Sequence, residues 1–348
     1  MNTTADAIAA IRKKLGRDLC IMGHHYQNDA VIAHCDISGD SLELARRVPH
    51  IDAARIVLCG VYFMGESASL LAREGQTVHL PEPDADCLMS AMIPIRLARR
   101  VLEQLALAGH AAVPLAYANT SLAVKALTGE YGGAVCTSAN AEIMLSWALQ
   151  RGESVIFMPD KNLGHNIANH LGIPENERHV LRIDGRGLIE PASQPLDRKL
   201  LLWPGTCSIH ARFRPEFVEQ ARSRYPGCRI AAHPECRQEV IALCDAAGST
   251  SFLIKEAARV AESAPGSTLV IGTEENLVHR LAERHRDKCD IFPLSHAICP
   301  EMSKVTEEKL LTVLEGIAGS GSEPLSVPEN LFEPARLSLT RMLEVCGK

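Results

Sequence analysis

The stretch LCIMGHHY, residues 19–26, is an apolar run that ends in a polar triplet, and this arrangement occurs three times in the chain. The second copy is VPLAYAN, residues 113–119, and the third is RIAAHPE, residues 229–235. Short runs rich in valine, isoleucine, leucine and alanine are typical of parallel strands that are buried on both faces of a sheet. The three copies therefore predict three similar α/β units.

Each copy continues in the same way until it reaches a cysteine. A serine or threonine at a predicted helix start follows the triplet, and a second apolar run comes after that helix. The three copies then end at Cys87, Cys207 and Cys299, and each of these cysteines has proline or glycine nearby in the sequence. A single loop cysteine is more often structural than a metal ligand. Because the same position recurs in three copies, however, we expect one shared metal centre.

Predicted helices separate the apolar runs. The clearest helical stretches are residues 42–47, 94–108, 141–150 and 252–264. Strands that alternate with helices in this way predict βαβ units around parallel sheets. Open sheets of this class bind ligands at the carboxyl ends of their strands. We therefore expect the triplets, the serines and the cysteines to face one cavity.

The length of the chain predicts more than one domain. A domain takes roughly 150 residues, so 348 residues suggest two or three. The tail contains a charged helical stretch, residues 304–317, and a last helix that reaches about Leu343, and we expect this tail to pack against the first copy. Residues 175–198 lengthen the second copy and are predicted to form a surface excursion.

The composition argues against several classes of function. The net charge of −6 comes from 36 basic and 42 acidic residues without long runs of one sign, which disfavours binding to nucleic acid or an anionic membrane. Aromatic residues are only 4%, too few for base-stacking platforms. No apolar run approaches the roughly 18 residues that span a bilayer, and residues 3–15 predict a capped amphipathic helix rather than a signal peptide. We expect a cytoplasmic protein.

The twelve cysteines do not predict a disulfide framework, because a long chain without a secretory signal belongs to a reducing compartment. Cys20, Cys59 and Cys136 lie in or beside apolar runs and are expected to pack as small hydrophobic side chains. Three well-separated cysteine ligands suit a [4Fe–4S] cluster that keeps one iron open. A structural zinc site would normally have four ligands with close C-x2-C pairs, and the sequence contains no such pair.

Two explanations remain open for the polar residues at the predicted helix starts. Serine and threonine are common helix N-caps, and this explanation requires no bound ligand. Helix N-termini also bind anions, so the same residues could hold carboxylate or phosphate groups. The residues concerned are Ser41, Ser138, Ser249 and Thr250. The motif Asp160-Lys161-Asn162 is similarly open, as a loop whose lysine reaches an anion or as a solvated turn.

Taken together, the motifs resemble those of the quinolinate synthase family, iron–sulfur enzymes of NAD biosynthesis. The resemblance runs from about residue 20 to about residue 305 and rests on GHHYQ, GDSLELA, YANT, CTSAN, PDKNLG, WPGTCSIH, HPEC, GST and CPEM. It implies three αβα domains around a pseudo-threefold axis with a central [4Fe–4S] cluster. The corresponding boundaries here are residues 1–88 with 300–348, residues 89–206, and residues 207–299.

The resemblance also implies a reaction and its residues. Iminoaspartate, supplied by L-aspartate oxidase, would condense with dihydroxyacetone phosphate to give quinolinate, phosphate and two waters. Tyr26 and Glu235 would be the leading acid–base pair, assisted by His24 and His210. The cluster ligands would be Cys87, Cys207 and Cys299. The implied substrate-binding residues are His24, Ser41, Tyr117, Ala118, Asn119, Ser138, His210, His233, Pro234, Glu235, Ser249 and Thr250.

The sequence departs from some family members at one place. Those members carry C-x2-C-x2-C around the third ligand, whereas this chain has Pro293, His296 and Cys299 there, so no additional thiol pair is expected. Cys289 is the nearest competitor for the third ligand. Alternative interpretations are another three-cysteine iron–sulfur protein, of the diphthamide or terminal methylerythritol phosphate type, and a non-catalytic α/β protein that binds a metabolite or senses iron.

Overall fold

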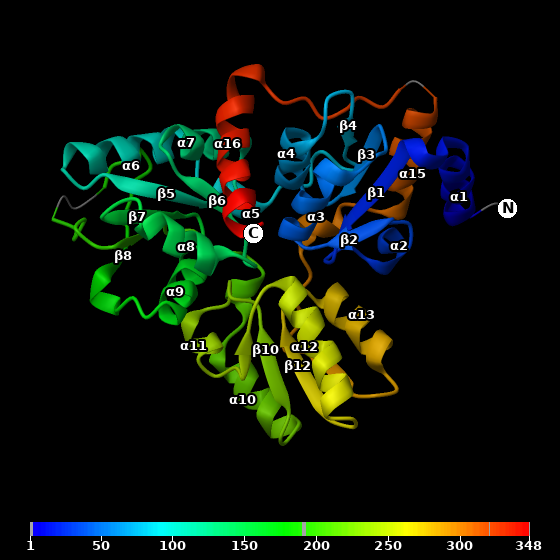
Figure 1. The fold of residues 1–348 in the computed structure, drawn as a ribbon. Helices are drawn as coiled ribbons and strands as arrows, with labels where there is room; N and C mark the ends of the chain where they lie inside the picture. The colour runs from blue at the N-terminus through cyan, green and yellow to red at the C-terminus, as the bar shows by residue number, and fades with distance from the viewer. Residues whose placement is uncertain (1–2, 190–192, 320, 348) are drawn as a thin grey trace.

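Three separate parallel sheets form three lobes that meet at the centre of the molecule (Figure 1). The computed structural model describes residues 3–189, 193–319 and 321–347. Helices flank each sheet, so the predicted α/β class is confirmed. In the described ranges, every pairing between named strands is parallel.

The first lobe contains a four-stranded sheet with the order β2-β1-β3-β4. Its strands are β1 (Leu19–His24), β2 (Ile37–Gly39), β3 (Arg55–Cys59) and β4 (Thr77–His79). Its helices are α1 (Thr4–Leu15), α2 (Asp29–Ile32), α3 (Ser41–Arg47), α4 (Tyr62–Leu71) and α5 (Leu88–Ala91). The predicted cap of the first helix is confirmed, because Thr3 and Asp6 form a reciprocal capping box.

The second lobe contains a five-stranded sheet with the order β6-β5-β7-β9-β8. Its strands are β5 (Ala112–Tyr117), β6 (Ala134–Cys136), β7 (Ser154–Met158), β8 (Arg178–Val180) and β9 (Leu200–Leu202). Its helices are α6 (Ile95–Leu107), α7 (Leu122–Glu130), α8 (Ala141–Leu149) and α9 (Lys161–His170). The segment expected to be a surface excursion supplies the edge strand β8, and part of it, residues 190–192, lies outside the described residues.

The third lobe contains a four-stranded sheet with the order β11-β10-β12-β13. Its strands are β10 (Arg229–Ala232), β11 (Ala246–Ala247), β12 (Thr268–Gly272) and β13 (Asp290–Pro293). Its helices are α10 (Pro215–Arg224), α11 (Gln238–Ile241), α12 (Thr250–Ser263) and α13 (Glu275–His285). The short helix α14 (Pro300–Ser303) follows this lobe, and its Met302 contacts Gln27 of the first lobe. Short 3-10 helices lie at Gly16–Asp18, Val48–His50, Glu175–Glu177 and His210–Arg212.

The same strand order explains why the sequence pattern repeats. In each sheet the strand that precedes the polar triplet pairs on one side with the second strand of its lobe and on the other side with the third. Such central strands are covered on both faces, and all six residues of β1 and all five of β7 are buried. Cys59 ends the central strand β3 and Cys136 ends the edge strand β6, and both have no solvent exposure, which confirms that they are core side chains.

The C-terminal tail divides between two lobes, which differs from the expectation that it packs on the first. Helix α15 (Glu307–Ala318) packs on the first lobe as expected, and Lys14 Nζ donates to Ala318 O at 3.1 Å. Helix α16 (Glu329–Cys346), red in Figure 1, runs between the first two lobes and packs closely on α7. Gly129 permits this approach, because an added Cβ would lie only 1.9 Å from Pro334 O. No helix in the described ranges is long and apolar enough to cross a membrane.

Candidate active site

One cavity lies where the three lobes meet, and it gathers most of the predicted site residues. The carboxyl ends of β1, β5 and β10 place the three polar triplets at its wall, as expected for parallel strands. The predicted residues that line it are His24, Tyr26, Ser41, Cys87, Tyr117, Asn119, Ser138, Cys207, His210, His233, Glu235, Thr250 and Cys299. Ala118, Pro234 and Ser249 are the predicted positions that are absent from this lining.

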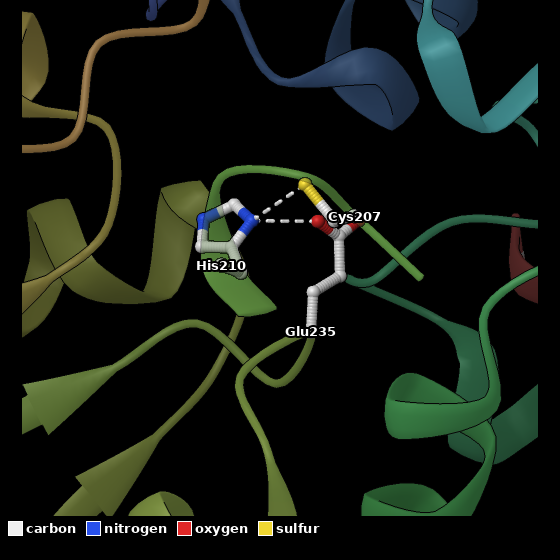
Figure 2. A group of neighbouring side chains, drawn as sticks. All are labelled: Cys207, His210 and Glu235. Carbon is white, nitrogen blue, oxygen red and sulfur yellow. Dashed lines mark hydrogen bonds and ion pairs between the residues drawn. The ribbon is translucent and has the colours of Figure 1, made fainter. Parts of the chain in front are cut away.

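Glu235, His210 and Cys207 form the most compact polar group in the cavity (Figure 2). Nδ1 of His210 lies 2.7 Å from Oε2 of Glu235 and 3.2 Å from Sγ of Cys207. The imidazole and the carboxylate are only 2% and 3% exposed. Because both groups are buried, these hydrogen bonds orient the carboxylate strongly.

A chain of hydroxyl groups links this group to Tyr26. Nε2 of His210 lies 3.1 Å from Oγ1 of Thr273, and this oxygen lies 2.8 Å from the Tyr26 hydroxyl. Oγ1 of Thr250 donates to the Tyr26 hydroxyl at 3.2 Å. The two residues expected to act as an acid–base pair are thus connected through Thr273 and His210. Thr273 was not predicted, although it follows β12 where the sequence places a polar residue directly after an apolar run.

The histidines of the cavity lie face to face or edge to face with their neighbours. The rings of His210 and His233 stack with centroids 4.4 Å apart, and Nε2 of His233 lies 3.2 Å from Oγ of Ser138. His24 meets Tyr26 edge to face at 4.6 Å. Burial lowers the pKa of His24 and of His233 to about 3 in each case. Both imidazoles are therefore neutral at physiological pH and can accept or donate a hydrogen bond.

The electrostatic environment keeps Glu235 ionised. Burial by itself raises the pKa of this carboxyl group, but the adjacent His233 and His210 imidazoles lower it. Hydrogen bonds from His210 and from Tyr117 lower it further, so the pKa of Glu235 lies below the usual value for glutamate. Burial also raises the pKa of Tyr26 and Tyr117 well above the usual value for tyrosine. The cavity thus combines the ionised carboxylate of Glu235 with two protonated phenols.

The structure separates the two explanations for the residues at the helix starts. Asp40, and not Ser41, caps α3 by accepting from Leu42 N and Glu43 N, so Ser41 is not needed as a cap. Ser138 does not cap a helix either, because Asn140 is the N-cap of α8. Ser249 does cap α12, by accepting from Phe252 N at 3.3 Å. The capping explanation therefore holds for Ser249 and is wrong for Ser41 and Ser138.

The PDKN motif is not a solvated turn, because it forms the start of helix α9. Asp160 is fully buried and caps α9, and Nδ2 of Asn162 donates to Glu235 O at 3.3 Å. From the next turn of α9, Nδ2 of Asn166 donates to Pro234 O and to Cys236 O, each at 2.8 Å. This helix of the second lobe therefore holds the HPEC loop of the third lobe in place.

The three predicted metal ligands come together in the cavity as thiols. Cys87 and Cys299 are the N-cap residues of the short helices α5 and α14, and Cys207 lies in a loop, so none is confined within a strand. Burial raises the pKa of all three, that of Cys87 to about 12. Cys289, the competitor for the third ligand, is 4% exposed and packs in the core of the third lobe.

This donor set fits a soft metal centre. Three sulfur ligands from three lobes border one space, and soft thiolates favour iron–sulfur clusters, copper and zinc. Cys207, His210 and Glu235 form a second group that could hold an ion, since their ligand atoms all lie within 4.8 Å of one another. The two sets share Cys207. The cavity can therefore hold a metal centre and still present uncommitted carboxylate, imidazole and hydroxyl groups.

Comparisons with known proteins match one family over nearly the whole chain. Residues 6–344 match the family model described as Quinolinate synthetase A protein (NadA). A quinolinate synthase of Acidobacterium capsulatum is 40% identical over 98% of this chain and 93% of its own length. Those of Bacillus velezensis, 41% identical over 97% and 91%, and Herpetosiphon aurantiacus, 40% identical over 98% and 92%, are similar in extent. The chain belongs to the quinolinate synthase family, whose members are enzymes of NAD biosynthesis.

Proposed function

We propose that the chain condenses iminoaspartate with dihydroxyacetone phosphate to form quinolinate, with release of phosphate and two waters. The observation that carries this proposal is the convergence of the predicted residues of all three repeats on one cavity, together with the family match over nearly the full chain. The link to L-aspartate oxidase follows from the substrate, because iminoaspartate must be produced by oxidation of aspartate. Twelve free thiols suit a reducing cytoplasm as the place of this reaction.

The cofactor that we propose is a [4Fe–4S] cluster held by Cys87, Cys207 and Cys299. Three lobes each supply one thiol to the same cavity, which suits a cluster that keeps one iron free of protein ligands. When bound, such a cluster supplies an open iron that acts as a Lewis acid toward a substrate oxygen. Asn119 Nδ2 lies 3.8 Å from Cys87 Sγ, at hydrogen-bonding distance for sulfur. This contact would stabilise the thiolate form of the first ligand.

Glu235 is the proposed general base of the condensation. Its carboxylate is buried and ionised, and His210 holds one oxygen in a fixed direction. Deprotonation of a substrate carbon or nitrogen requires such a positioned acceptor. Tyr26, with its phenol protonated and linked to His210 through Thr273, is the proposed acid partner. The protonated phenol of Tyr117, which also donates to Glu235, would keep the base aligned.

The remaining polar groups would bind the anionic substrates. Ser41 and Ser138 have hydroxyl groups that are not needed as helix caps, and both line the cavity. We assign them, with His24, His233 and Asn119, to the carboxylate and phosphate groups. Thr250 would act from the third lobe through its contact with Tyr26. Three predicted binding residues do not line the cavity themselves, although their neighbours do: Ala118, Pro234 and Ser249. They would act by fixing the backbone position of those neighbours.

The proposed architecture is a pseudo-threefold arrangement of three αβα domains. The repeated strand order supports it, since each sheet places its triplet-bearing strand between the second and third strands of the same lobe. The proposed domains are residues 1–88 with 300–348, residues 89–206 and residues 207–299. Helix α16 belongs in sequence to the first domain and packs on α7 of the second, so it would tie the two together.

The decisive experiment is anaerobic purification and reconstitution followed by spectroscopy and an assay. We expect brown protein with about four irons per chain that forms quinolinate from dihydroxyacetone phosphate and enzymatically generated iminoaspartate. Protein that stays colourless after reconstitution would contradict the cluster. Iron-loaded protein that binds both substrates without forming quinolinate would contradict the reaction but leave the cluster in place.

A further inference from the structure

Two buried carboxyl groups occupy equivalent places in the second and third lobes. Asp160 follows β7, the third strand of its lobe, and caps α9, while Glu274 follows β12 and caps α13. Both side chains have 0% exposure. The equivalent position in the first lobe is Val61, which precedes α4 and has no side-chain acceptor. The proposed chemistry uses neither acid, although full burial of a carboxyl group costs free energy unless hydrogen bonds compensate.

Each of these carboxyl groups also accepts from the backbone of a cysteine that lines the cavity. Cys207 N donates to Oδ2 of Asp160 at 2.8 Å, and Cys299 N donates to Oε1 of Glu274 at 3.5 Å. In the first lobe, Cys87 N donates to Oδ1 of the preceding residue Asp86 at 2.8 Å. All three cysteine amides are therefore held by a carboxyl oxygen, although the acid comes from a different place in the first lobe.

Both oxygens of the two buried groups are in use. Oδ1 of Asp160 accepts from Leu163 N at 2.9 Å, so one oxygen holds the helix and the other holds the Cys207 loop. Oε2 of Glu274 accepts from Asn276 N at 2.9 Å, while Oε1 accepts from Asn276 Nδ2 at 2.9 Å and from Cys299 N at 3.5 Å. A carboxyl group offers two acceptor oxygens, whereas an amide offers one acceptor and one donor. Asparagine or glutamine at these positions would turn a donor toward a buried N–H.

We propose that Asp160 and Glu274 are positioning residues that fix the Cys207 and Cys299 loops so that both thiols face the cavity. Each couples the start of a helix to a cysteine loop, so that packing of α9 and α13 sets the place of the sulfur. This proposal rests on the proposed role of the cysteines as cluster ligands. Groups that orient metal ligands through hydrogen bonds, without binding the metal themselves, are commonly as important for metal retention as for activity.

The test compares Asp160→Asn and Glu274→Gln with the wild-type full chain after anaerobic reconstitution. Thr306→Ala is the matched control, because Thr306 caps α15 by accepting from Lys309 N and does not line the cavity. We expect the two variants to retain iron about 10- to 100-fold less well against a ferrous-iron chelator, with an altered visible absorption band. Thr306→Ala should retain iron as the wild type does.

Hydrogen exchange of the metal-free proteins supplies a readout that does not depend on the cluster. Amides of residues 203–210 should exchange faster in Asp160→Asn, and those of residues 294–303 faster in Glu274→Gln, while β1 and β5 stay protected. Unchanged exchange in both loops would overturn the proposal, even if iron retention fell. If the wild type bound no iron, the proposed cofactor would be wrong. Hydrogen exchange alone would then test whether the two acids fix the cysteine loops. If Asp160→Asn did not fold, Glu274→Gln would carry the test.

Discussion

Nδ1 of His210 lies 2.7 Å from a carboxylate oxygen of Glu235 and 3.2 Å from the sulfur of Cys207. One imidazole therefore touches both the proposed base and a proposed cluster ligand. A carboxylate attracts an N–H more strongly than a neutral thiol does, so in the metal-free protein the N–H is directed at Glu235. The base and the metal centre are consequently neighbours, and their contributions can be separated by substitution.

Glu235→Gln should remove activity and keep the metal. Glutamine preserves the shape of the side chain but cannot accept the substrate proton, so we expect kcat to fall by about 10²- to 10⁴-fold. Iron content and the visible spectrum should match the wild type. Steady-state assays together with iron analysis check this, with Glu262→Gln on the exposed side of α12 as the control. Full turnover in Glu235→Gln would exclude it as the base.

Substitution of the cysteines should divide them into two groups. Cys87→Ser, Cys207→Ser and Cys299→Ser should each fail to form the visible absorption of the cluster, because each removes one of the sulfur donors at the cavity. Cys228→Ser and Cys244→Ser should form it, since neither residue lines that cavity. Absorption spectra and iron analysis after reconstitution measure the difference. Loss of the cluster in Cys244→Ser would show that the ligand set is misassigned.

Two serines that look alike in the sequence should behave differently. Ser249 caps α12, and its replacement by alanine should lower the free energy of unfolding by about 1 kcal/mol. Ser138 contacts His233 in the cavity and caps no helix, so Ser138→Ala should raise KM for the substrates with little change in stability. Denaturant unfolding and steady-state kinetics of both variants test this contrast. A loss of stability in Ser138→Ala larger than in Ser249→Ala would contradict it.

Gly129→Ala should destabilise the junction of α7 and α16. An alanine Cβ would lie 1.9 Å from Pro334 O, a backbone atom that cannot move without displacing α16. Overpacking of this kind typically costs about 1 to 3 kcal/mol, and thermal unfolding measures it. Gly185→Ala serves as the control, because an added Cβ at Gly185 would meet no atom within 4 Å and Gly185 does not have positive φ. An unchanged melting temperature in Gly129→Ala would show that α16 is not tightly packed there.

The buried Lys125 should make stability depend on pH in a defined window. Its Nζ donates to Thr120 O at 2.8 Å and to Phe63 O at 3.3 Å, and burial lowers its pKa to about 8 from 10.5. Below pH 8 the lysine binds a proton in both the folded and unfolded states. Between pH 8 and 10.5 only the unfolded chain retains this proton, so the contribution of Lys125 to stability rises with pH.

Lys125→Met removes this group with little change of volume. Relative to the variant, the wild type should gain up to about 3 kcal/mol of unfolding free energy between pH 8 and 10.5. Urea unfolding of both proteins at several pH values isolates the effect, because all other titrating groups are common to them. A difference between the two proteins that stayed constant over this window would mean that Lys125 titrates normally.

Much of the site could be predicted because its residues sit at the ends of predictable elements. The apolar run before His24 is typical of a buried strand and forms β1, and the carboxyl end of such a strand is where a parallel sheet presents ligands. Cys87, Cys207 and Cys299 could be chosen from twelve because they close repeated segments. These inferences use only the order of residues along the chain and the local geometry of strands and helices.

The contacts between lobes could not be predicted in this way. Asn166 of the second lobe meets Pro234 of the third, and Thr273 joins Tyr26 to His210, only because separate sheets pack around one centre. Helix α16 lies on α7 because Gly129 leaves room for it, which its own amphipathic pattern does not reveal.

The sequence by itself determined the three α/β units, their strand ends and the identity of the chemical groups, because these depend on local periodicity and residue type. Tertiary structure decided which of those groups touch, and which serine is a cap and which is free to bind. That outcome depends on backbone directions at each helix start and on packing between residues far apart in the chain, such as Asp160 with Cys207. Neither the backbone directions nor the long-range packing is encoded in any single stretch of residues.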